Sequence, residues 1–354
     1  MRILLTGASG LIGGELAGLL AAPGHAVTAL LHHGREVRRN DGSLLPTRPW
    51  AEEPRPGAVS VLSGNVGEKL LGLEPSAYEA LRDGLDLIVH LAAVTAFDAA
   101  PSLLRAVNID GTTNILALAA GGTRRVPLLH VSTAYVCGEV SGAVAEDDAT
   151  GAGRFTNGYE ASKAEAEGLV EQARRDGLPV VIARPSIVVG AYADGIIGRL
   201  DGVYALIRLV AEGRVRTLPV TTGASLDLVP IDHVTAGLLH LAERMERAAG
   251  RNVHLVSGRP VPVAMLAGLA AEYPHFATVL LVPPDQFDAS QLTPRRAVVH
   301  RQVTAHYTSY LQRDPRFLDD NLRALGGSPC PPTDVAFLRR MVDRCIQTGY
   351  LRAA

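Results

Sequence analysis

The sequence is short of several residue types, and each shortage excludes a class of protein. Three cysteines, Cys137, Cys330 and Cys345, are too few and too scattered for a disulfide framework or a metal site. No run reaches the roughly 18 apolar residues that a membrane-spanning helix needs. The net charge of -2 provides no basic footprint for nucleic acid. We therefore expect a cytoplasmic protein without a metal, a membrane span or a nucleic-acid partner.

Aromatic residues and lysines are also scarce. Aromatics make up 5% of the chain, which predicts a core rich in Leu, Val and Ala. The basic residues are almost all arginines, because the chain holds only two lysines, Lys69 and Lys163. A length of 354 residues is ample for a large buried core. It favours one main domain with a smaller lobe.

Short apolar runs alternate with helical stretches in the first half of the chain. Strands are predicted at 2–6, 26–31, 59–62, 87–91, 128–132 and 180–183, and helices at 11–22, 103–120 and 159–175. This alternation is typical of an α/β fold with a doubly wound parallel sheet, the Rossmann fold. Four prolines predict a surface loop over 41–58.

The alternation loosens after Gly190. Helices are predicted over 196–212 and 234–248, strands over 226–229 and 253–256, and mostly helix after about residue 261. We expect a Rossmann domain over 1–190 and a smaller, mostly helical substrate lobe over 191–354. Some elements of the lobe, about 226–257, are expected to return to the main sheet.

Three glycines, Gly7, Gly10 and Gly13, follow the first predicted strand and open the first predicted helix. Gly7 permits a tight turn, Gly10 lets backbone N–H groups approach a pyrophosphate, and Gly13 lets the helix lie close to the strand. The helix N-terminus adds free amides and a partial positive charge. A plain turn of small residues is the alternative, but the position after an N-terminal strand favours NAD(P) binding.

The end of the second predicted strand bears on the choice of cofactor. An acidic residue there would bind a ribose 2′-hydroxyl and repel a 2′-phosphate, and none precedes Glu36. Arg35, with Arg38 or Arg39, is suited to pair with a 2′-phosphate, although a solvated loop also accounts for these arginines. We expect NADP(H) to be preferred over NAD(H).

Tyr159 and Lys163 stand four residues apart at the start of a predicted helix, so they share one face. An ammonium near a phenol lowers the pKa of the phenol, and such a tyrosine can exchange a proton with a substrate oxygen. Ser132 and Thr133 follow the fifth predicted strand, at the sheet edge where ligands bind. A hydroxyl there can hydrogen-bond the substrate oxygen. An exposed Tyr–Lys pair without function is the alternative.

Together these segments resemble the extended branch of the short-chain dehydrogenase/reductase superfamily. The matching segments, in family order, are 6–13, 90–93, 108–112, 130–135, 159–163, 184–186 and 228–232. Segments 131–135, 157–163 and 184–190 and the tail 310–321 are similar to acyl-thioester and fatty acyl reductases. Many of those enzymes have Arg where this chain has His32 or His33. No carrier or adenylation domain precedes these segments, so a free-standing enzyme is expected.

The resemblance implies a role for each matching residue. Tyr159 is the acid/base, Lys163 binds the nicotinamide ribose, and Thr133 hydrogen-bonds the substrate, with Ser132 as its neighbour. Asn108 supports the helix and is a candidate for a proton relay. The implied cofactor contacts are Gly7, Ser9, Gly10, Leu11, Ile12, Gly13, His32, Arg35, Asn65, Val66, Leu91, Ala92, Ala93, Lys163, Pro185, Ser186 and Ile187.

Three functions stay open at this point. The first is an NADPH-dependent reductase that transfers hydride to a carbonyl, either from acyl thioester to aldehyde or from ketone or aldehyde to alcohol. A carrier is a candidate for delivering its substrate, and a homodimer is compatible with the C-terminal helices. The second is a nucleotide-sugar epimerase or dehydratase, which needs a nucleotide-diphosphate clamp that the sequence does not identify. The third is a non-catalytic NAD(P)-binding sensor, a class that usually lacks the Tyr–Lys pair.

Overall fold

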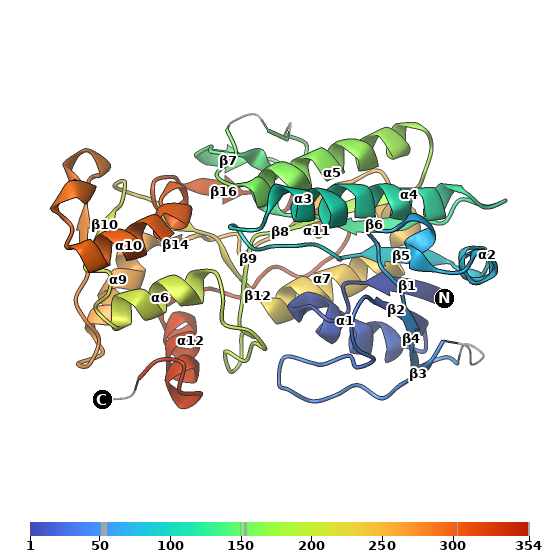
Figure 1. The fold of residues 1–354 in the computed structure, drawn as a ribbon, viewed down its shortest axis with the longest axis horizontal. Helices are drawn as coiled ribbons and strands as arrows, with labels where there is room; N and C mark the ends of the chain where they lie inside the picture. Colours follow the sequence, from blue (N-terminus) through green and yellow to red (C-terminus); the bar gives the residue numbers. More distant parts are fainter. Residues whose placement is uncertain (51–54, 149, 152–153, 303, 353–354) are drawn as a thin grey trace.

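The computed structural model describes residues 1–50, 55–148, 150–151, 154–302 and 304–352. Its centre is an eight-stranded parallel sheet with the strand order β13-β8-β6-β5-β1-β2-β4-β3 (Figure 1). The strands are β1 Arg2–Thr6, β2 Ala26–Leu31, β3 Thr47–Pro49, β4 Val59–Ser63, β5 Leu87–His90, β6 Leu128–Val131, β8 Val180–Pro185 and β13 Asn252–Leu255. The prediction of a doubly wound parallel sheet is confirmed.

The order of the strands reverses beside β1. From β1 the chain builds outward through β2 and β4, and it then returns to β5 on the other side and continues through β6 and β8. In open α/β sheets, ligands bind beyond the carboxyl ends of the strands at such a reversal. Thr6 and His90, which end β1 and β5, hydrogen-bond each other there at 2.7 Å between Oγ1 and Nδ1.

Helices cover both faces of the sheet, which explains why its strands are apolar throughout. In Figure 1, α4 and α5 lie on one side, and α1 and α7 on the other. Successive side chains of a strand point to opposite faces. Ile3 and Leu5 accordingly belong to the core under α1 and α7, and Leu4 to the core under α4 and α5. These helices are α1 Leu11–Ala21, α2 Pro75–Gly84, α4 Gly111–Ala120, α5 Gly158–Arg175, α7 Ile231–Glu243 and α8 Met245–Ala248.

The helix predicted over 103–120 consists of three joined pieces. It begins with α3 Pro101–Leu104, continues through the π-helical turn η2 Arg105–Asp110, and ends with α4. A π turn inserts one extra residue into a helix and is often found at functional sites. Here it contains Asn108, one of the predicted site residues.

The predicted surface loop over 41–58 is wrong at its centre. Thr47–Pro49 forms β3, which pairs with β4 at the edge of the sheet, and Trp50 N donates to Val61 O at 3.0 Å. An edge strand accepts Pro49 because one of its sides has no partner strand. Residues 51–54 of the predicted loop lie outside the described residues.

Two elements of the second half also differ from expectation. The helix predicted over 196–212 begins only at Val203, after Gly202 at φ +58°. The predicted strand 226–229 is split into β11 Ser225–Leu226 and β12 Leu228–Pro230, which pair with β14 Val261–Pro262 and β9 Ile187–Val189 outside the main sheet. Of the elements in 226–257, β13 joins the main sheet beside β8.

The C-terminal lobe lies at the left of Figure 1. Its elements are α6 Val203–Ala211, β10 Thr217–Pro219, α9 Val263–Ala271, β15 Leu280–Val282, α10 Pro294–Gln302 and α12 Val335–Gln347. Helix α11 Asp320–Ala324 instead packs against β13 of the main sheet. One hydrophobic core contains Tyr204 of α6, Phe337 of α12 and also Tyr135, which follows β6 of the main sheet. Strand β16 Pro315–Phe317 pairs with β7 Gly142–Val144. The lobe is thus fixed to the segment that carries the predicted catalytic residues.

Candidate active site

The glycine turn after β1 is packed too closely for side chains. Gly7 has φ +74°, and a Cβ on it would lie 2.7 Å from Ala92 N. A Cβ on Gly13 would lie 2.1 Å from Gly7 O, so helix α1 approaches the strand as closely as the motif predicts. Gly10 precedes α1, and no side chain caps the helix there. The free amides of its first turn therefore face the end of β1, where an anionic group can bind.

The loop after β2 leaves one arginine unpaired. Arg39 forms an ion pair with Glu15 at 2.9 Å, and Arg38 contacts Glu36 at 3.4 Å. Arg35 is exposed, and its guanidinium has no partner in the described part of the chain. His32 is also exposed in this loop. These two side chains are free to meet a group bound at the end of β2.

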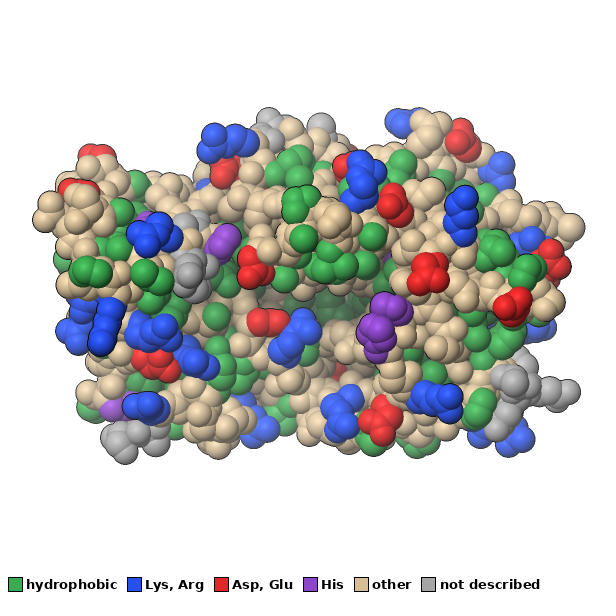
Figure 2. All heavy atoms as spheres, in the orientation of Figure 1, with side chains coloured by type: hydrophobic (Ala, Val, Ile, Leu, Met, Phe, Trp, Pro, Cys, Tyr) green, Lys and Arg blue, Asp and Glu red, His purple; other side chains and the backbone are tan. Residues whose placement is uncertain are grey.

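Other predicted cofactor contacts lie around the same sheet edge. The backbone N–H groups of Leu91 and Ala92 donate to Thr6 Oγ1 at 3.2 and 3.1 Å, which fixes the segment after β5 against β1. Leu11, Ile12 and Ala93 are partly exposed and Ser9 is exposed, while Val66 and Pro185 are buried. The face shown in Figure 2 is hollowed near its centre, with histidine and basic side chains at the rim.

Two of the predicted cofactor residues use their side chains in hydrogen bonds within the protein. Asn65 Oδ1 accepts from Gly67 N at 3.0 Å, and its Nδ2 donates to Glu68 at 2.8 Å. The Ser186 hydroxyl donates to the buried carboxylate of Asp227. The backbone N–H groups at both positions also have partners, because Asn65 N donates to Leu71 O at 2.8 Å and Ser186 N donates to Leu255 O at 3.3 Å. Ile187, next to Ser186, is partly buried and begins β9.

Thr133 and Tyr159 come together beyond the end of β6. Thr133 caps the short turn η3 Ala134–Cys137, and its hydroxyl accepts from Tyr135 N at 3.3 Å. Tyr159 lies at the start of α5. Burial raises the pKa of Tyr159, the charge of Glu160 raises it further, and a hydrogen bond with Thr133 opposes the rise. Tyr159 is therefore a neutral phenol, suited to donating a proton to a substrate oxygen.

Lys163 does not act on Tyr159 as predicted. The predicted lowering of the Tyr159 pKa by the lysine is wrong for this structure. Lys163 is 2% exposed, and its Nζ donates to Val131 O at 2.8 Å rather than to the phenol. Burial lowers the pKa of Lys163 to about 8, against the opposing effect of Glu167. The Glu167 carboxylate also accepts from Nε and Nη2 of the buried Arg184 guanidinium, at 3.0 and 2.7 Å.

Two buried histidines lie near the lysine. Burial and the charge of Lys163 lower the pKa of His90 to about 3 and that of His130 well below its ordinary value. The two rings are 5.5 Å apart. Because both imidazoles are neutral, the ammonium of Lys163 is the positive charge of this part of the site.

The titration of Lys163 predicts a pH dependence of activity. Its ammonium is present below about pH 8 and is lost above it. If that charge orients the cofactor and supports proton delivery, kcat/KM for the reduced cofactor will fall above about pH 8 with the loss of one proton. A pH–rate profile of the wild type and of Lys163→Met checks this, and a Lys163→Met profile with the same limb would contradict it.

The same shift predicts a rise of stability with pH. The pKa of Lys163 falls on folding from its ordinary value of 10.5 to about 8. Between these values the unfolded chain binds more protons, so the free energy of unfolding rises with pH across this window. Urea denaturation at a series of pH values should show a smaller rise for Lys163→Met than for the wild type.

Asn108 braces the segment after β5 against α5. Its Oδ1 accepts from Val94 N at 2.8 Å, and its Nδ2 donates to Val94 O at 3.0 Å and to Ser162 Oγ at 2.8 Å. Ser162 Oγ in turn donates to Tyr159 O at 2.8 Å. Asn108 thereby positions the backbone at Tyr159. Ser132 is buried, and its hydroxyl has no hydrogen-bond partner among the described residues.

Arg313 is the residue near the site that the sequence did not reveal. It donates to Gly138 O and, at 3.2 Å, to Glu160, and its guanidinium lies over the rings of Tyr135 and Tyr310. The Tyr310 hydroxyl donates to the same carboxylate. This cluster joins the C-terminal lobe to the residue beside Tyr159. Similarity of the tail 310–321 was the one available signal, and it did not single out Arg313.

An aromatic residue connects this cluster to Tyr159. The ring of Phe97 stacks on Tyr310 with centroids 5.8 Å apart, and it lies 6.4 Å from the ring of Tyr159. It also lies 5.8 Å from Tyr307. These aromatic rings therefore lie next to the ring of Tyr159.

The C-terminal lobe holds an apolar cavity of about 770 Å³. Eighteen side chains line it, all of them hydrophobic, including Leu206 of α6, Leu266 of α9 and Met341 of α12. Leu311 reaches it from the short turn η7 Ser309–Leu311, next to Tyr310 of the cluster above. A cavity with this lining favours an apolar ligand.

The described ranges contain neither a membrane-spanning helix nor a metal-binding cluster. None of the helices there has the length and apolar character to cross a membrane. No group of three or more His, Cys, Asp or Glu side chains is placed there to hold a metal ion.

The chain is similar to known proteins both in sequence and in structure. A family model described as male sterility protein matches residues 5–238. The aldehyde reductase lnaA of Aspergillus flavus is 30% identical over 270 residues, or 72% of this chain, and the chain covers 25% of that protein. The terminal R domain from the myxalamid PKS-NRPS biosynthetic pathway has a TM-score of 0.80 and 28% identity, over 99% of this chain and 92% of that one.

A more distant likeness concerns the fold alone. UDP-glucuronic acid 4-epimerase from Bacillus cereus, solved with NAD, has a TM-score of 0.65 and 20% identity, over 100% of this chain and 99% of that one.

Proposed function

We propose that this chain reduces an acyl thioester to an aldehyde with NADPH. The chain belongs to the male sterility protein family and is an NAD(P)-binding oxidoreductase of the extended short-chain type. The observation that carries the thioester is the apolar cavity of the lobe, whose eighteen lining side chains are all hydrophobic. An acyl chain can fill such a cavity. The hydroxyls of a sugar nucleotide would lose their hydrogen bonds in it.

The dinucleotide fits the sheet edge by its shape and its charge. The turn at Gly7 and Gly13 has no room for a Cβ, and the first turn of α1 presents uncapped amides, so a pyrophosphate can approach the backbone closely. Lys163, whose Nζ donates to Val131 O at 2.8 Å in this structure, would hold the nicotinamide ribose. When bound, NADPH supplies the hydride.

The residues of the chain would then act on the substrate oxygen. Thr133 and Tyr159 hydrogen-bond the carbonyl oxygen, which favours addition of hydride at the carbonyl carbon because charge develops on that oxygen. The neutral phenol of Tyr159 is the source of the proton. Collapse of the tetrahedral adduct re-forms the C=O bond and breaks the C–S bond. The hydroxyl proton passes to the departing thiolate and the Tyr159 oxygen regains a proton from solvent, so an aldehyde and a free thiol result.

Delivery of the substrate on a carrier is part of the same proposal. The similar R domain comes from a PKS-NRPS pathway, and the chain is matched over almost its whole length by that domain. A thioester arm long enough to reach from a carrier surface into the site would serve such an enzyme. Free acyl-CoA presents the same thioester and is the simplest substrate to test.

The test is a parallel screen of NADPH oxidation. Acyl-CoA thioesters of several chain lengths, aldehydes, ketones and UDP-glucose are each supplied with NADPH and, separately, with NADH. The proposal expects oxidation of NADPH with the thioesters. Interconversion of UDP-glucose without net consumption of the cofactor would favour the epimerase alternative instead.

Arg35 provides a prediction for the choice of cofactor. Its guanidinium is unpaired in the described part of the chain, so we expect it to bind the 2′-phosphate of NADPH. Arg35→Ala should raise KM for NADPH by about tenfold, or ~1.4 kcal/mol, and leave KM for NADH unchanged. Arg38→Ala is the matched control, because Arg38 already contacts Glu36. Equal effects of Arg35→Ala on both cofactors would remove the basis for the preference.

A further inference from the structure

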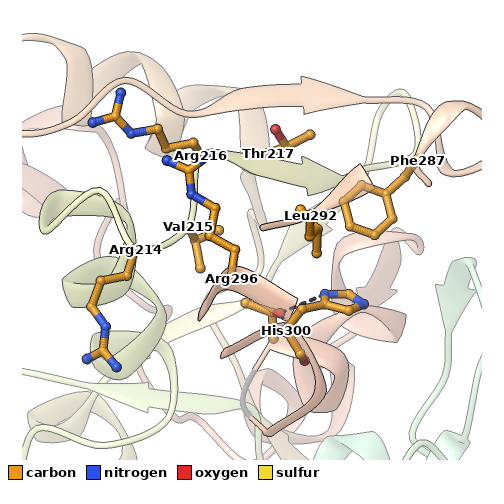
Figure 3. A pocket seen from close by; sticks show the side chains of 9 residues that line it. Arg214, Val215, Arg216, Thr217, Phe287, Leu292, Arg296 and His300 are labelled. Carbon is orange, nitrogen blue, oxygen red and sulfur yellow. Dashed lines mark hydrogen bonds between the residues drawn. The ribbon is translucent and has the colours of Figure 1, made fainter. Parts of the chain in front are cut away.

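A second, small cavity, open to solvent, lies in the C-terminal lobe between β10 and α10 (Figure 3). Arg214, Arg216 and Thr217 reach it from the start of β10, and Arg296 and His300 from α10. In Figure 3 the side chain of Arg296 rises from its helix toward Arg216, whereas Arg214 points away from both. Two guanidinium groups from elements about 80 positions apart therefore meet over one cavity.

The positive charge of this cavity is not neutralised by the protein. Arg214 lies 3.7 Å from Glu212, but neither Arg216 nor Arg296 has an acidic partner in the ranges that the structure describes. The sequence around α10 reinforces the charge, because residues 289–313 contain four arginines, two histidines and no acidic residue. Unpaired arginines on convergent elements attract an anion, and their planar groups suit a phosphate.

The cavity is connected to the active site through one short turn. Thr304, which lines the cavity, begins the turn η6 Thr304–Tyr307. Tyr307 ends that turn and packs against Phe97, which lies beside Tyr159. A 3₁₀ turn of this length rises about 6–8 Å. This turn and two ring contacts, 5.8 Å between Tyr307 and Phe97 and 6.4 Å between Phe97 and Tyr159, separate the cavity from Tyr159, and a flexible arm anchored in the cavity would have to cross that span.

The basic cavity also adjoins the apolar one. Thr217 and Leu218 are consecutive in β10, and Thr217 lines the basic cavity whereas Leu218 lines the apolar cavity. Because successive side chains of a strand point to opposite faces, the two cavities lie on opposite faces of this short strand.

We propose that the basic cavity binds the phosphate of a phosphopantetheine thioester, with Arg216 and Arg296 as its ligands. The inference rests on the proposed function, because it names the group by which that substrate would be held. The phosphate is shared by coenzyme A and by a carrier-borne arm. Thr217 and His300 offer further polar groups to it, and His300 Nδ1 is within 2.8 Å of the Thr304 hydroxyl.

The test compares substrates with and without the phosphate. The variants are Arg216→Ala/Arg296→Ala and the control Arg339→Ala, whose exposed side chain pairs with Glu272 and lines neither cavity. Each is assayed with an acyl-CoA, the same acyl group on phosphopantetheine, on pantetheine without phosphate, and on a carrier protein. The double variant should raise KM about tenfold or more for the phosphorylated thioesters. Its kcat, its KM for acyl-pantetheine and its melting temperature should stay unchanged, as should every property of Arg339→Ala.

The outcome for each substrate distinguishes the two sources of the phosphate. A raised KM for the carrier substrate but not for acyl-CoA identifies the carrier-borne arm as the natural source, and the converse identifies coenzyme A. An unchanged KM for every phosphorylated thioester overturns the proposal. So does an equal rise for acyl-pantetheine, which would mean a structural effect.

A binding measurement separates this inference from the proposed function. Calorimetric titration of the wild type and the double variant with coenzyme A and with UDP-glucose needs no turnover. Binding of coenzyme A that depends on the two arginines supports the cavity even if no thioester is reduced. If thioesters are reduced but coenzyme A binds the wild type and the double variant equally well, the proposed phosphate site is overturned and the proposed function is not. Binding of UDP-glucose but not coenzyme A in an arginine-dependent way overturns the phosphopantetheine assignment.

Discussion

Replacing Tyr159 by Phe should lower kcat for thioester reduction by roughly 10²–10⁴-fold, the usual contribution of a positioned acid. The substitution removes only the hydroxyl, which hydrogen-bonds with Thr133 and which burial keeps protonated. The ring stays, so its packing near Phe97 is retained. The dissociation constant for NADPH should therefore stay within about twofold. Steady-state kinetics and a fluorescence titration of NADPH measure the two quantities.

Tyr192→Phe is the matched control for this experiment. Its ring stacks on Phe337 in the C-terminal lobe, away from Thr133 and Lys163. It should retain wild-type turnover. Turnover by Tyr159→Phe at more than about a tenth of the wild-type rate would remove the phenol from the mechanism.

The second large effect concerns stability. Arg313→Met should lower the free energy of unfolding by about 3–5 kcal/mol, because removal of one partner leaves the other as an uncompensated buried charge. Arg313 and Glu160 are 5% and 0% exposed, and the Tyr310 hydroxyl also depends on that carboxylate. Methionine keeps much of the packing volume. Equilibrium urea denaturation gives the difference.

Two further variants test the cause of that loss. Arg316→Met removes an arginine that pairs with Asp314 but is 67% exposed, so it should cost less than about 1 kcal/mol. Adding Glu160→Gln to Arg313→Met should restore part of the loss, because the buried charge is then gone. If Arg313→Met and Arg316→Met were equally mild, the cluster would not be what fixes the lobe beside Tyr159.

Local patterns explain why much of this fold could be predicted. The strand at 2–6 is apolar throughout because both faces of the sheet are covered, and Gly13 is a glycine because its Cβ would meet Gly7 O. Tyr159 and Lys163 share a face because four residues make about one helical turn. Each of these signals lies within a few residues, so sequence alone carries it.

The features that were missed depend on contacts distant in sequence. Arg313 meets Glu160 across 153 positions, and neither neighbourhood signals the other. The strand Thr47–Pro49 forms because it pairs with β4, in spite of Pro49. Burial and the charge of Glu160 raise the pKa of Tyr159, and Lys163 donates to Val131 O rather than to the phenol. Burial of this kind has no local pattern.

The most direct test of the proposed reaction counts two products of one turnover. Purified protein is mixed with an acyl-CoA and NADPH, and the oxidation of NADPH and the release of free thiol are followed together. The account predicts one thiol released for each NADPH oxidised, with an aldehyde formed, and loss of both signals in Tyr159→Phe. Oxidation of NADPH without thiol release, or thiol release that does not need NADPH, would contradict it.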